Sequence, residues 1–118
     1  PQLVLMGDFN ITFDDADVWD PVGLRETIHC TTEEREQLRG LIDLGLADSL
    51  RMFNPQPNVY TWWDYRALGF QRNRGMRIDH ILVSRALAQL ARGCHVDKAP
   101  RKNQRPSDHA PVVLTLGA

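Results

Sequence analysis

Five polar side chains stand where apolar runs of this sequence end or are interrupted. They are Asp8, Asn10, Asp79, Asp108 and His109. Burying a carboxylate is costly unless a partner stabilises its charge. We therefore expect the strand ends to meet at one shared polar site, with Asp79 hydrogen-bonded to His109. Carboxylate, amide and imidazole groups gathered in this way can orient water, move protons and hold a divalent cation.

The first two of these side chains follow the apolar run 3–6. Such a run suits a strand that is buried on both faces, and strand alternation would point Asp8 and Asn10 the same way. The carboxyl ends of strands are where α/β sheets usually place chemistry. However, Gly, Asp and Asn all favour turns, so the segment 7–10 is by itself equally compatible with a simple turn.

Periodicity and capping signals predict the elements that must position these groups. Thr31 and Glu34 form a capping box, and the leucines that follow at helical spacing predict a helix over 32–44. A short helix is expected after Ser84. Predicted strands cover residues 46–53, 59–65, 78–83, 94–98 and 112–116. The segment 11–30 is predicted to be a surface loop with a solvated acidic part, and 66–77 and 98–105 are predicted to be basic loops.

Composition fits one soluble globular domain, because 42% of the 118 residues are hydrophobic and 25% are charged. The charge is divided: residues 1–50 carry a net −8 and residues 51–118 a net +7. This division is compatible with an anionic partner on the second half, or with two solvated faces that neutralise each other. No apolar run approaches the roughly 20 residues of a membrane span. Two cysteines without CxxC spacing favour a reduced intracellular protein over a disulfide framework or a zinc site.

The sequence begins at Pro1, two residues before the apolar run 3–6. A strand expected in the middle of a sheet would normally have flanking chain upstream. We therefore expect residues 1–118 to be a C-terminal part of a longer protein.

Four segments, in this order, carry a resemblance to a known family. They are Gly7–Asn10, Tyr60–Arg66, Asn73–Asp79 and Ser107–His109. Together they resemble the exodeoxyribonuclease III family of apurinic/apyrimidinic endonucleases, within the endonuclease/exonuclease/phosphatase superfamily. The resemblance covers essentially the whole chain and corresponds to the C-terminal half of that enzyme.

The resemblance implies an α/β (α+β) fold with one mixed, mostly antiparallel sheet and flanking helices. This would be half of a four-layer sandwich of the DNase I-like type. The implied activity is Mg²⁺-dependent phosphodiester hydrolysis in DNA repair, with Mn²⁺ as an alternative metal. The implied partner is double-stranded DNA with abasic sites or 3′ ends, in the cytoplasm of a bacterium, with no membrane involved.

The resemblance also assigns roles to the polar side chains. Asp8 would orient or activate the attacking water, and Asn10 would hold a phosphate oxygen. His109, oriented by Asp79, would stabilise the scissile phosphate, and the neighbouring carboxylate should favour its charged form. Asp108 would belong to the metal site, partly through water, as is common for Mg²⁺.

Substrate-binding positions follow from the same resemblance. Trp62 and Met76, and less clearly Ile78, match the apolar positions that line a pocket for a sugar without a base. Arg66, Arg74 and the other arginines of 72–77 would contact DNA phosphates. The alternatives are that the apolar residues belong to the core and that the arginines lie on solvated loops.

Other aromatic and histidine residues receive different expectations. Strand alternation makes Trp63 and His80 packing or surface residues, and no role is assigned to His29 or His95. The family's N-terminal half, which supplies a metal-binding Glu, an Asn and a Tyr, is not part of this sequence. The chain alone should therefore be inactive or nearly so, and its uncovered sheet face should promote self-association. Alternative functions are a phosphohydrolase acting on lipid or inositol phosphates, and a non-catalytic DNA-binding module.

Overall fold

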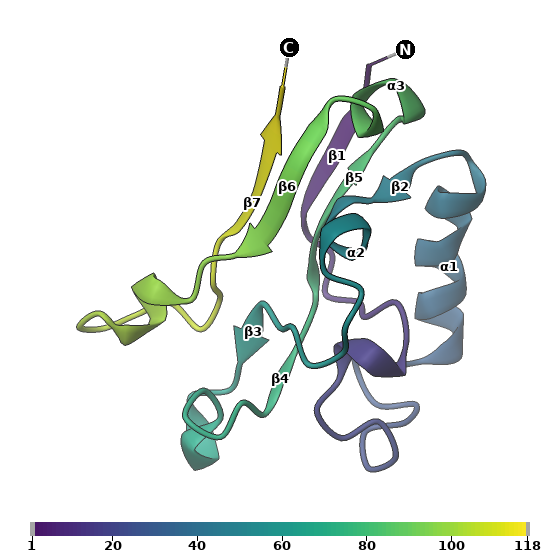
Figure 1. The fold of residues 1–118 in the computed structure, drawn as a ribbon. Helices are drawn as coiled ribbons and strands as arrows, with labels where there is room; N and C mark the ends of the chain where they lie inside the picture. The colour runs from purple at the N-terminus through teal and green to yellow at the C-terminus, as the bar shows by residue number, and fades with distance from the viewer. Residues whose placement is uncertain (1, 118) are drawn as a thin grey trace.

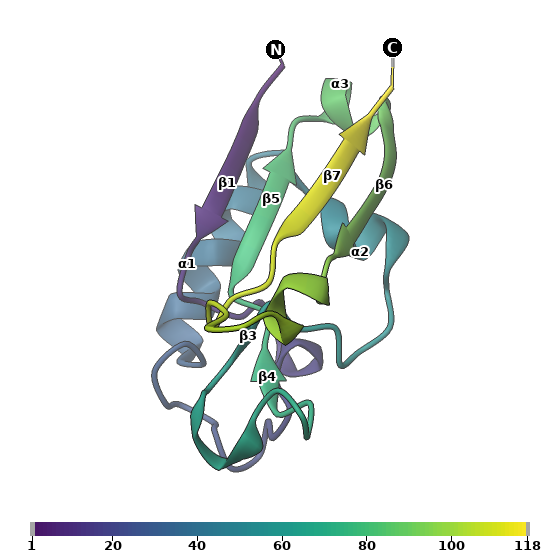
Figure 2. The same ribbon diagram turned by 90° about the vertical axis from the view of Figure 1, so that its left-hand side faces the viewer.

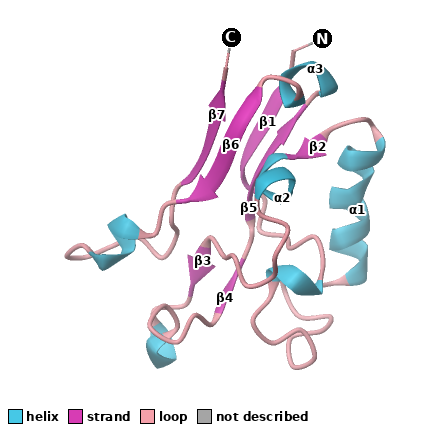
Figure 3. Cartoon of the chain, viewed as in Figure 1, coloured by secondary structure: helices cyan, strands magenta, loops and turns pink. Residues whose placement is uncertain are grey.

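A β-layer with its longer helices on one face forms the framework of the computed structural model, which describes residues 2–117 (Figures 1 and 2). The strands are β1 (Val4–Asp8), β2 (Ala47–Asp48), β3 (Trp62–Trp63), β4 (Gly75–Met76), β5 (Asp79–Val83), β6 (Ala91–Val96) and β7 (Val112–Leu116). The helices are α1 (Thr32–Asp43), α2 (Ser49–Phe53) and α3 (Arg85–Ala88). Three short 3-10 turns are η1 (Asp15–Asp17), η2 (Arg66–Leu68) and η3 (Ala99–Lys102). Long loops join these elements (Figure 3).

All strand pairs are antiparallel, and they form three hydrogen-bonded groups: β1-β5-β2, β3-β4 and β6-β7. The β6-β7 hairpin continues the layer, with β7 beside β5 (Figure 2). The register of β1 and β5 places Asp8 directly opposite Asp79. The predicted α/β class, with an antiparallel layer and flanking helices, is confirmed.

The core lies mainly between the β-layer and the helices behind it. Leu82 on β5 packs with Phe13 and with Leu38 of α1. On the neighbouring side, Ile81 and Val83 pack with apolar residues of α3 and the β6-β7 hairpin. Since adjacent residues of β5 point to opposite faces, this short strand is anchored on both sides.

The capping box predicted at the start of helix α1 is confirmed. The Thr31 hydroxyl accepts a hydrogen bond from the Glu34 N–H at 3.1 Å and donates one to the Glu34 carboxylate at 2.8 Å. Leu38 is the buried residue of its apolar face. The helix ends before Gly45, whose φ of +105° suits glycine. Through Leu38 the helix packs against Leu82 of β5.

The expectation that the first strand is buried on both faces is wrong for these residues. All five residues of β1 are exposed, and the exposed fraction of Met6 is 67%. The reason is position, because among the described residues β1 hydrogen-bonds only to β5 and so forms an edge of its sheet. Hydrophobicity alone predicted the strand but not what covers it.

The predicted strand over 46–53 is also wrong beyond its first residues. Only Ala47–Asp48 is extended, and residues 49–53 form α2. Ser49 donates from its hydroxyl to the Ile81 carbonyl at 2.6 Å, and Leu50 is buried. These tertiary contacts turn the chain into a helix across the back of β5.

Three further boundaries differ from those predicted. The strand expected over 59–65 is reduced to β3, and a two-residue strand, β4, lies within the predicted loop 66–77. β6 begins at Ala91, three residues before the strand predicted over 94–98, and the short helix expected after Ser84 ends at Ala88. Cys30 and Cys94 are free and buried, as expected of unpaired thiols. Among the described residues, no helix has the length and apolar character needed to cross a membrane.

Candidate active site

His109 lies between three carboxylates at one end of the β-layer. Its Nδ1 is 2.8 Å from Asp79 Oδ2, and its Nε2 is 3.6 Å from Asp8 Oδ2 and 3.8 Å from Asp108 Oδ1. Asp8 ends β1, Asp79 begins β5, and the His109 backbone bridges to Trp62 on β3. The structure thus brings together the carboxylates and the imidazole that the sequence marked as one site.

The carboxylates around His109 favour its positive charge. Partial burial opposes the charged imidazole, but the hydrogen bond that its Nδ1–H donates to Asp79 and the negative charges of Asp79, Asp8 and Asp108 outweigh it. The pKa of His109 is therefore raised above its ordinary value. With Nδ1 held by Asp79, Nε2 is the atom that can face a substrate oxygen.

Asn10 occupies a tight turn rather than a continuation of β1. Its φ of +58° is in the left-handed region, and its N–H donates to Asp8 Oδ1 at 3.0 Å. Both interpretations of this segment are therefore partly right, because the strand ends at Asp8 and a turn follows. Asn10 is exposed. A residue held in a strained conformation beside polar groups is often found at functional sites.

Two histidines fasten this turn through its carbonyl groups. His29 Nδ1 lies 2.5 Å from the Asn10 carbonyl oxygen, and His80 Nε2 lies 2.7 Å from that of Ile11. Since a carbonyl only accepts, each ring nitrogen is the donor. The packing role predicted for His80 is confirmed by its 1% exposed fraction.

Sequence reasoning missed His29, whose ring centroid also lies 6.2 Å from that of Trp62. It stands in an irregular loop where no periodicity marks it, so no local signal reveals its partner 19 residues away.

Trp62 connects the cluster to an adjoining cavity. Its Nε1 donates to Asp108 Oδ2 at 2.9 Å, and it lies opposite Met76 in the β3-β4 pair. Trp62 and Met76 both line a cavity of about 420 Å³. Met76 also packs in the core with Val18 and Ile78 and is 6% exposed, so the core alternative holds for Ile78 and in part for Met76.

The predicted DNA-contacting arginines have different environments. Arg66 is exposed and forms a two-pronged pair with Asp64, with a closest distance of 2.8 Å. Arg74 lies over the Trp19 ring, 5.0 Å from its centroid. Both line the same cavity as Trp62. Arg74 has no carboxylate partner among the described residues, whereas Arg66 is already paired with Asp64.

Arg77 corrects the expectation that every arginine of 72–77 faces DNA. Its side chain is 1% exposed, with Nε 2.7 Å from Asp17 and its two terminal nitrogens 3.0 and 2.6 Å from Asp48. Arg51 pairs with the same Asp17. The segment predicted to be solvated thus includes one fully buried carboxylate, because two arginines neutralise it.

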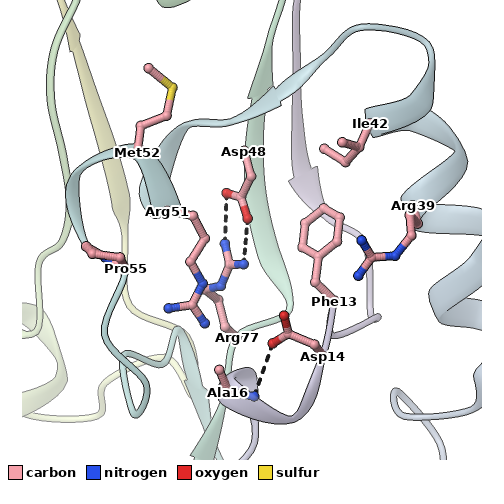
Figure 4. Close-up of a pocket in the computed structure, with 10 residues that line it drawn as sticks. All are labelled: Phe13, Asp14, Ala16, Arg39, Ile42, Asp48, Arg51, Met52, Pro55 and Arg77. Atoms are coloured by element: carbon pink, nitrogen blue, oxygen red, sulfur yellow. Dashed lines mark hydrogen bonds and ion pairs between the residues drawn. The ribbon is translucent and has the colours of Figure 1, made fainter.

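A second cavity, of about 480 Å³, lies on the helix side near this ion network (Figure 4). Figure 4 shows Arg77 joined to Asp48 by two hydrogen bonds, with Arg51 beside it. Because these charges are already matched, we interpret the network as a support for the segments that carry the site. It joins η1, β2, α2 and the residue next to β4.

The oxygen and nitrogen atoms of the cluster could supply some, but not all, of the ligands of a hard divalent cation such as Mg²⁺. Asp8, Asp79 and His109 each offer a ligand atom within 4.8 Å of one another. However, Asp79 and His109 are hydrogen-bonded to each other, which leaves Asp8 and Asp108 as the freer carboxylates. Oxygen ligands suit Mg²⁺, which completes its shell with several waters. The described residues therefore supply only part of such a site.

Comparison with known proteins places the geometry in a family. The model of the Endonuclease/Exonuclease/phosphatase family matches residues 1–109. Exodeoxyribonuclease III of Haemophilus influenzae is 42% identical over 117 residues, covering 93% of this chain and 44% of that protein. The 3′ phosphatase NExo from Neisseria, solved with a product DNA hairpin, is 50% identical with a TM-score of 0.96. An AP endonuclease from Archaeoglobus fulgidus is 34% identical with a TM-score of 0.93.

These matches extend along nearly the whole of this chain but along less than half of its relatives. Each of the two structures is matched over 99% of this chain and 46% of the other. The resemblance inferred from the ordered motifs is confirmed, since the relatives are named as exodeoxyribonucleases and AP endonucleases. The chain belongs to the endonuclease/exonuclease/phosphatase family.

Proposed function

We propose that this chain provides the water-activating and phosphate-binding part of a metal-dependent DNA phosphodiesterase. The proposed activity is that of an abasic-site endonuclease and 3′–5′ exonuclease in DNA repair, in the cytoplasm. The observation that carries the proposal is His109, fixed by Asp79 at 2.8 Å and facing Asp8 and Asp108.

The cluster can serve both sides of an in-line phosphodiester hydrolysis. Asp8 would orient or deprotonate the attacking water, and the charged His109 would stabilise the phosphate as negative charge develops. The exposed amide of Asn10 would hold a phosphate oxygen. Asp108, with water and further ligands, would hold Mg²⁺ or Mn²⁺, whose charge offsets that of the phosphate and leaving oxygen.

The cavity beside the cluster supports a DNA substrate. Trp62 and Met76 give it an apolar wall, which suits a sugar that has lost its base. Arg66 and Arg74 supply positive charge for flanking phosphates. We therefore propose duplex DNA with abasic sites or 3′ ends as the substrate. Phosphate contacts of this kind weaken as the salt concentration rises.

The site is incomplete within these 118 residues. Among the described residues 2–117, Asp8 and Asp108 are the freer carboxylates of the cluster, and the chain spans less than half of its relatives' length. We propose that residues 1–118 form the C-terminal half of the domain and that the missing metal ligand lies in the other half. The isolated chain should then be inactive or nearly so, because groups that act together fail steeply when one is absent.

The test uses the full-length protein and two DNA substrates in Mg²⁺. One duplex carries a single tetrahydrofuran residue as an abasic analogue, and the other has a recessed 3′ end. We expect cleavage of the first, digestion of the second, or both, and a loss of about 100-fold or more in kcat for Asp8→Asn and His109→Asn. Asp43→Asn, an exposed position at the end of α1, is the matched control.

Two outcomes would redirect the assignment. Release of phosphate from inositol phosphates or hydrolysis of a phospholipid, with no action on either DNA, would favour the small-ester phosphohydrolase. Salt-sensitive DNA binding with no cleavage in Mg²⁺ or Mn²⁺ would favour a non-catalytic binding module.

A further inference from the structure

Trp19 is a large aromatic residue that stands partly in solvent beside the β3-β4 hairpin. Its exposed fraction is 39%. Its backbone N–H donates to the Gly75 carbonyl at 3.1 Å, and the preceding residue, Val18, bridges to Met76. The main chain therefore fixes the position of Trp19, so that its indole is not needed to hold the segment in place.

The indole of Trp19 is paired with a cation. The guanidinium of the exposed Arg74 lies over its ring, 5.0 Å from the centroid, which is a cation–π arrangement. Arg74 makes no ion pair with a carboxylate among the described residues 2–117. Its charge thus remains open to an anion, while the flat pair offers a surface on which a planar ring can stack.

This pair forms part of the wall of the 420 Å³ cavity beside the catalytic cluster. On the same wall stands Trp62, whose Nε1 is bonded to Asp108 at 2.9 Å. The indole of Trp62 therefore touches the cavity and the cluster at once. The cavity volume lies in the range of pockets that bury small organic ligands, and the Trp62–Met76 wall is only one part of it.

We propose that Trp19 and Arg74 form a stacking platform for an unpaired nucleobase of bound DNA, in a nucleotide next to the scissile phosphodiester. The proposal depends on the proposed function for its ligand class, DNA. An aromatic ring stacks on any base, and an adjacent arginine adds attraction both to the base and to its phosphate. The platform thus distinguishes a nucleotide that carries a base from one that has lost it, whichever of the four bases is present.

Binding measurements in EDTA separate this platform from the chemistry. The full-length protein is titrated into two duplexes that end in one unpaired 3′ nucleotide, which carries 2-aminopurine in one and is a tetrahydrofuran residue in the other. Trp19→Ala should weaken binding to the base-bearing DNA by about tenfold or more and change binding to the tetrahydrofuran DNA much less. Trp19→Phe, which keeps a stacking ring, should restore most of the loss.

Arg74→Gln should weaken binding to both DNAs and also reduce the salt dependence of binding, because it removes a charge as well as a stacking surface. Phe53→Ala is the matched control, since Phe53 on α2 is 38% exposed but lies outside the cavity. It should leave both affinities unchanged.

The proposed stacking role is wrong if Trp19→Ala weakens binding to both DNAs equally or to neither. It is also wrong if Trp19→Phe weakens binding as much as Trp19→Ala. Failure of the proposed function has a separate signature, because the wild-type protein would then cleave neither DNA in Mg²⁺ whatever its binding preference.

Discussion

The imidazole of His109 has Asp79 on one side, 2.8 Å from Nδ1, and Asp8 and Asp108 on the other. These four residues come from three separated parts of the sequence. The hydrogen bond between Asp79 and His109 could be predicted, because a carboxylate inside an apolar run needs a partner. The geometry adds direction, since the bond at Nδ1 leaves Nε2 as the nitrogen that faces the site.

Asp79→Asn should lower the pKa of His109. The carboxylate currently favours the charged imidazole by a hydrogen bond and by its charge, and these effects outweigh the opposing effect of burial. Because the folded-state pKa is raised, the imidazole stays protonated to a higher pH than an ordinary histidine and loses its proton as the pH rises through the raised value. NMR titration of the His109 ring protons, without metal, measures the midpoint in the wild-type and variant proteins.

Asp43→Asn is the control for that titration, because its carboxylate is exposed at the far end of α1. An unchanged His109 midpoint in Asp79→Asn would show that the Asp79 carboxylate does not set the charge of this imidazole. The activity profile should follow the same direction, with the variant losing activity at lower pH than the wild-type protein.

Other residues could not be placed from the sequence, because their partners are remote. Arg77 sits among arginines in a stretch that looks like a basic loop, yet its carboxylate partners are 60 and 29 residues away. His29 has its partner 19 residues away, at the carbonyl of a turn. Local composition reveals charge but not burial, so a buried ion network and an exposed basic loop look alike in one sequence.

At the scale of elements, prediction succeeded where local signals were complete. Helix α1 has a capping box, an apolar face and a glycine stop, and its predicted and observed bounds differ by one residue at the C-terminal end. Helix α2 has no side-chain cap and is five residues long, so contacts with β5 decide its conformation. The two short strands β3 and β4 likewise depend on pairing across the loop between them.

The turn after β1 is an element held by its neighbours rather than by its own sequence. Asn10 has a left-handed φ of +58°, which costs a non-glycine residue roughly 1 kcal/mol or more. His80, on the opposite face of β5 from Asp79, donates to the Ile11 carbonyl at 2.7 Å. Burial and the nearby Arg77 lower the pKa of His80, which keeps the ring neutral. We infer that His80 is a positioning residue for Asp8 and Asn10.

His80→Leu should lower kcat more than it raises KM. The change leaves a carbonyl without its donor, at a cost of about 1–3 kcal/mol, and it loosens the turn that follows Asp8 and carries Asn10. A small misplacement of catalytic groups can reduce the rate about 100-fold. Steady-state kinetics of the full-length protein, with thermal unfolding measured in parallel, separates this effect from loss of folded protein.

His80→Gln supplies the decisive comparison, because a glutamine amide can also donate to the Ile11 carbonyl. It should recover a substantial part of kcat. Equal kcat values for the glutamine and leucine variants, in proteins that unfold at the same temperature, would mean that the hydrogen bond does not position the turn.

At the scale of the whole molecule, the chain is a thin slab whose edge strand β1 is exposed on both sides. Its extents are 43 × 34 × 21 Å, and its radius of gyration of 14.4 Å slightly exceeds the roughly 13.5 Å typical of this length. The longer helices lie behind the β-layer (Figure 2), and β1 is exposed along its length, whereas β5 beside it is mostly buried. The exposed large apolar residues on β1, β7 and the residue before β1 are Leu3, Val4, Leu5, Met6, Val113 and Leu116. Contiguous apolar surface on an edge strand favours association.

The isolated 118-residue chain should therefore associate, and, on the proposed division of the domain, the other half should compete for the same surface. Sedimentation velocity of the chain alone should show concentration-dependent species larger than a monomer. Met6→Lys together with Val113→Lys should shift it toward monomer, since charge on an exposed edge opposes pairing. Val22→Lys, at a 76% exposed loop position, should not.

Adding the other half as a separate polypeptide should give a one-to-one complex that cleaves DNA in Mg²⁺. A monodisperse monomer at tens of micromolar would show that this apolar surface does not drive association. Cleavage of DNA at enzymatic rates by the chain alone would contradict the proposal that its metal site is incomplete.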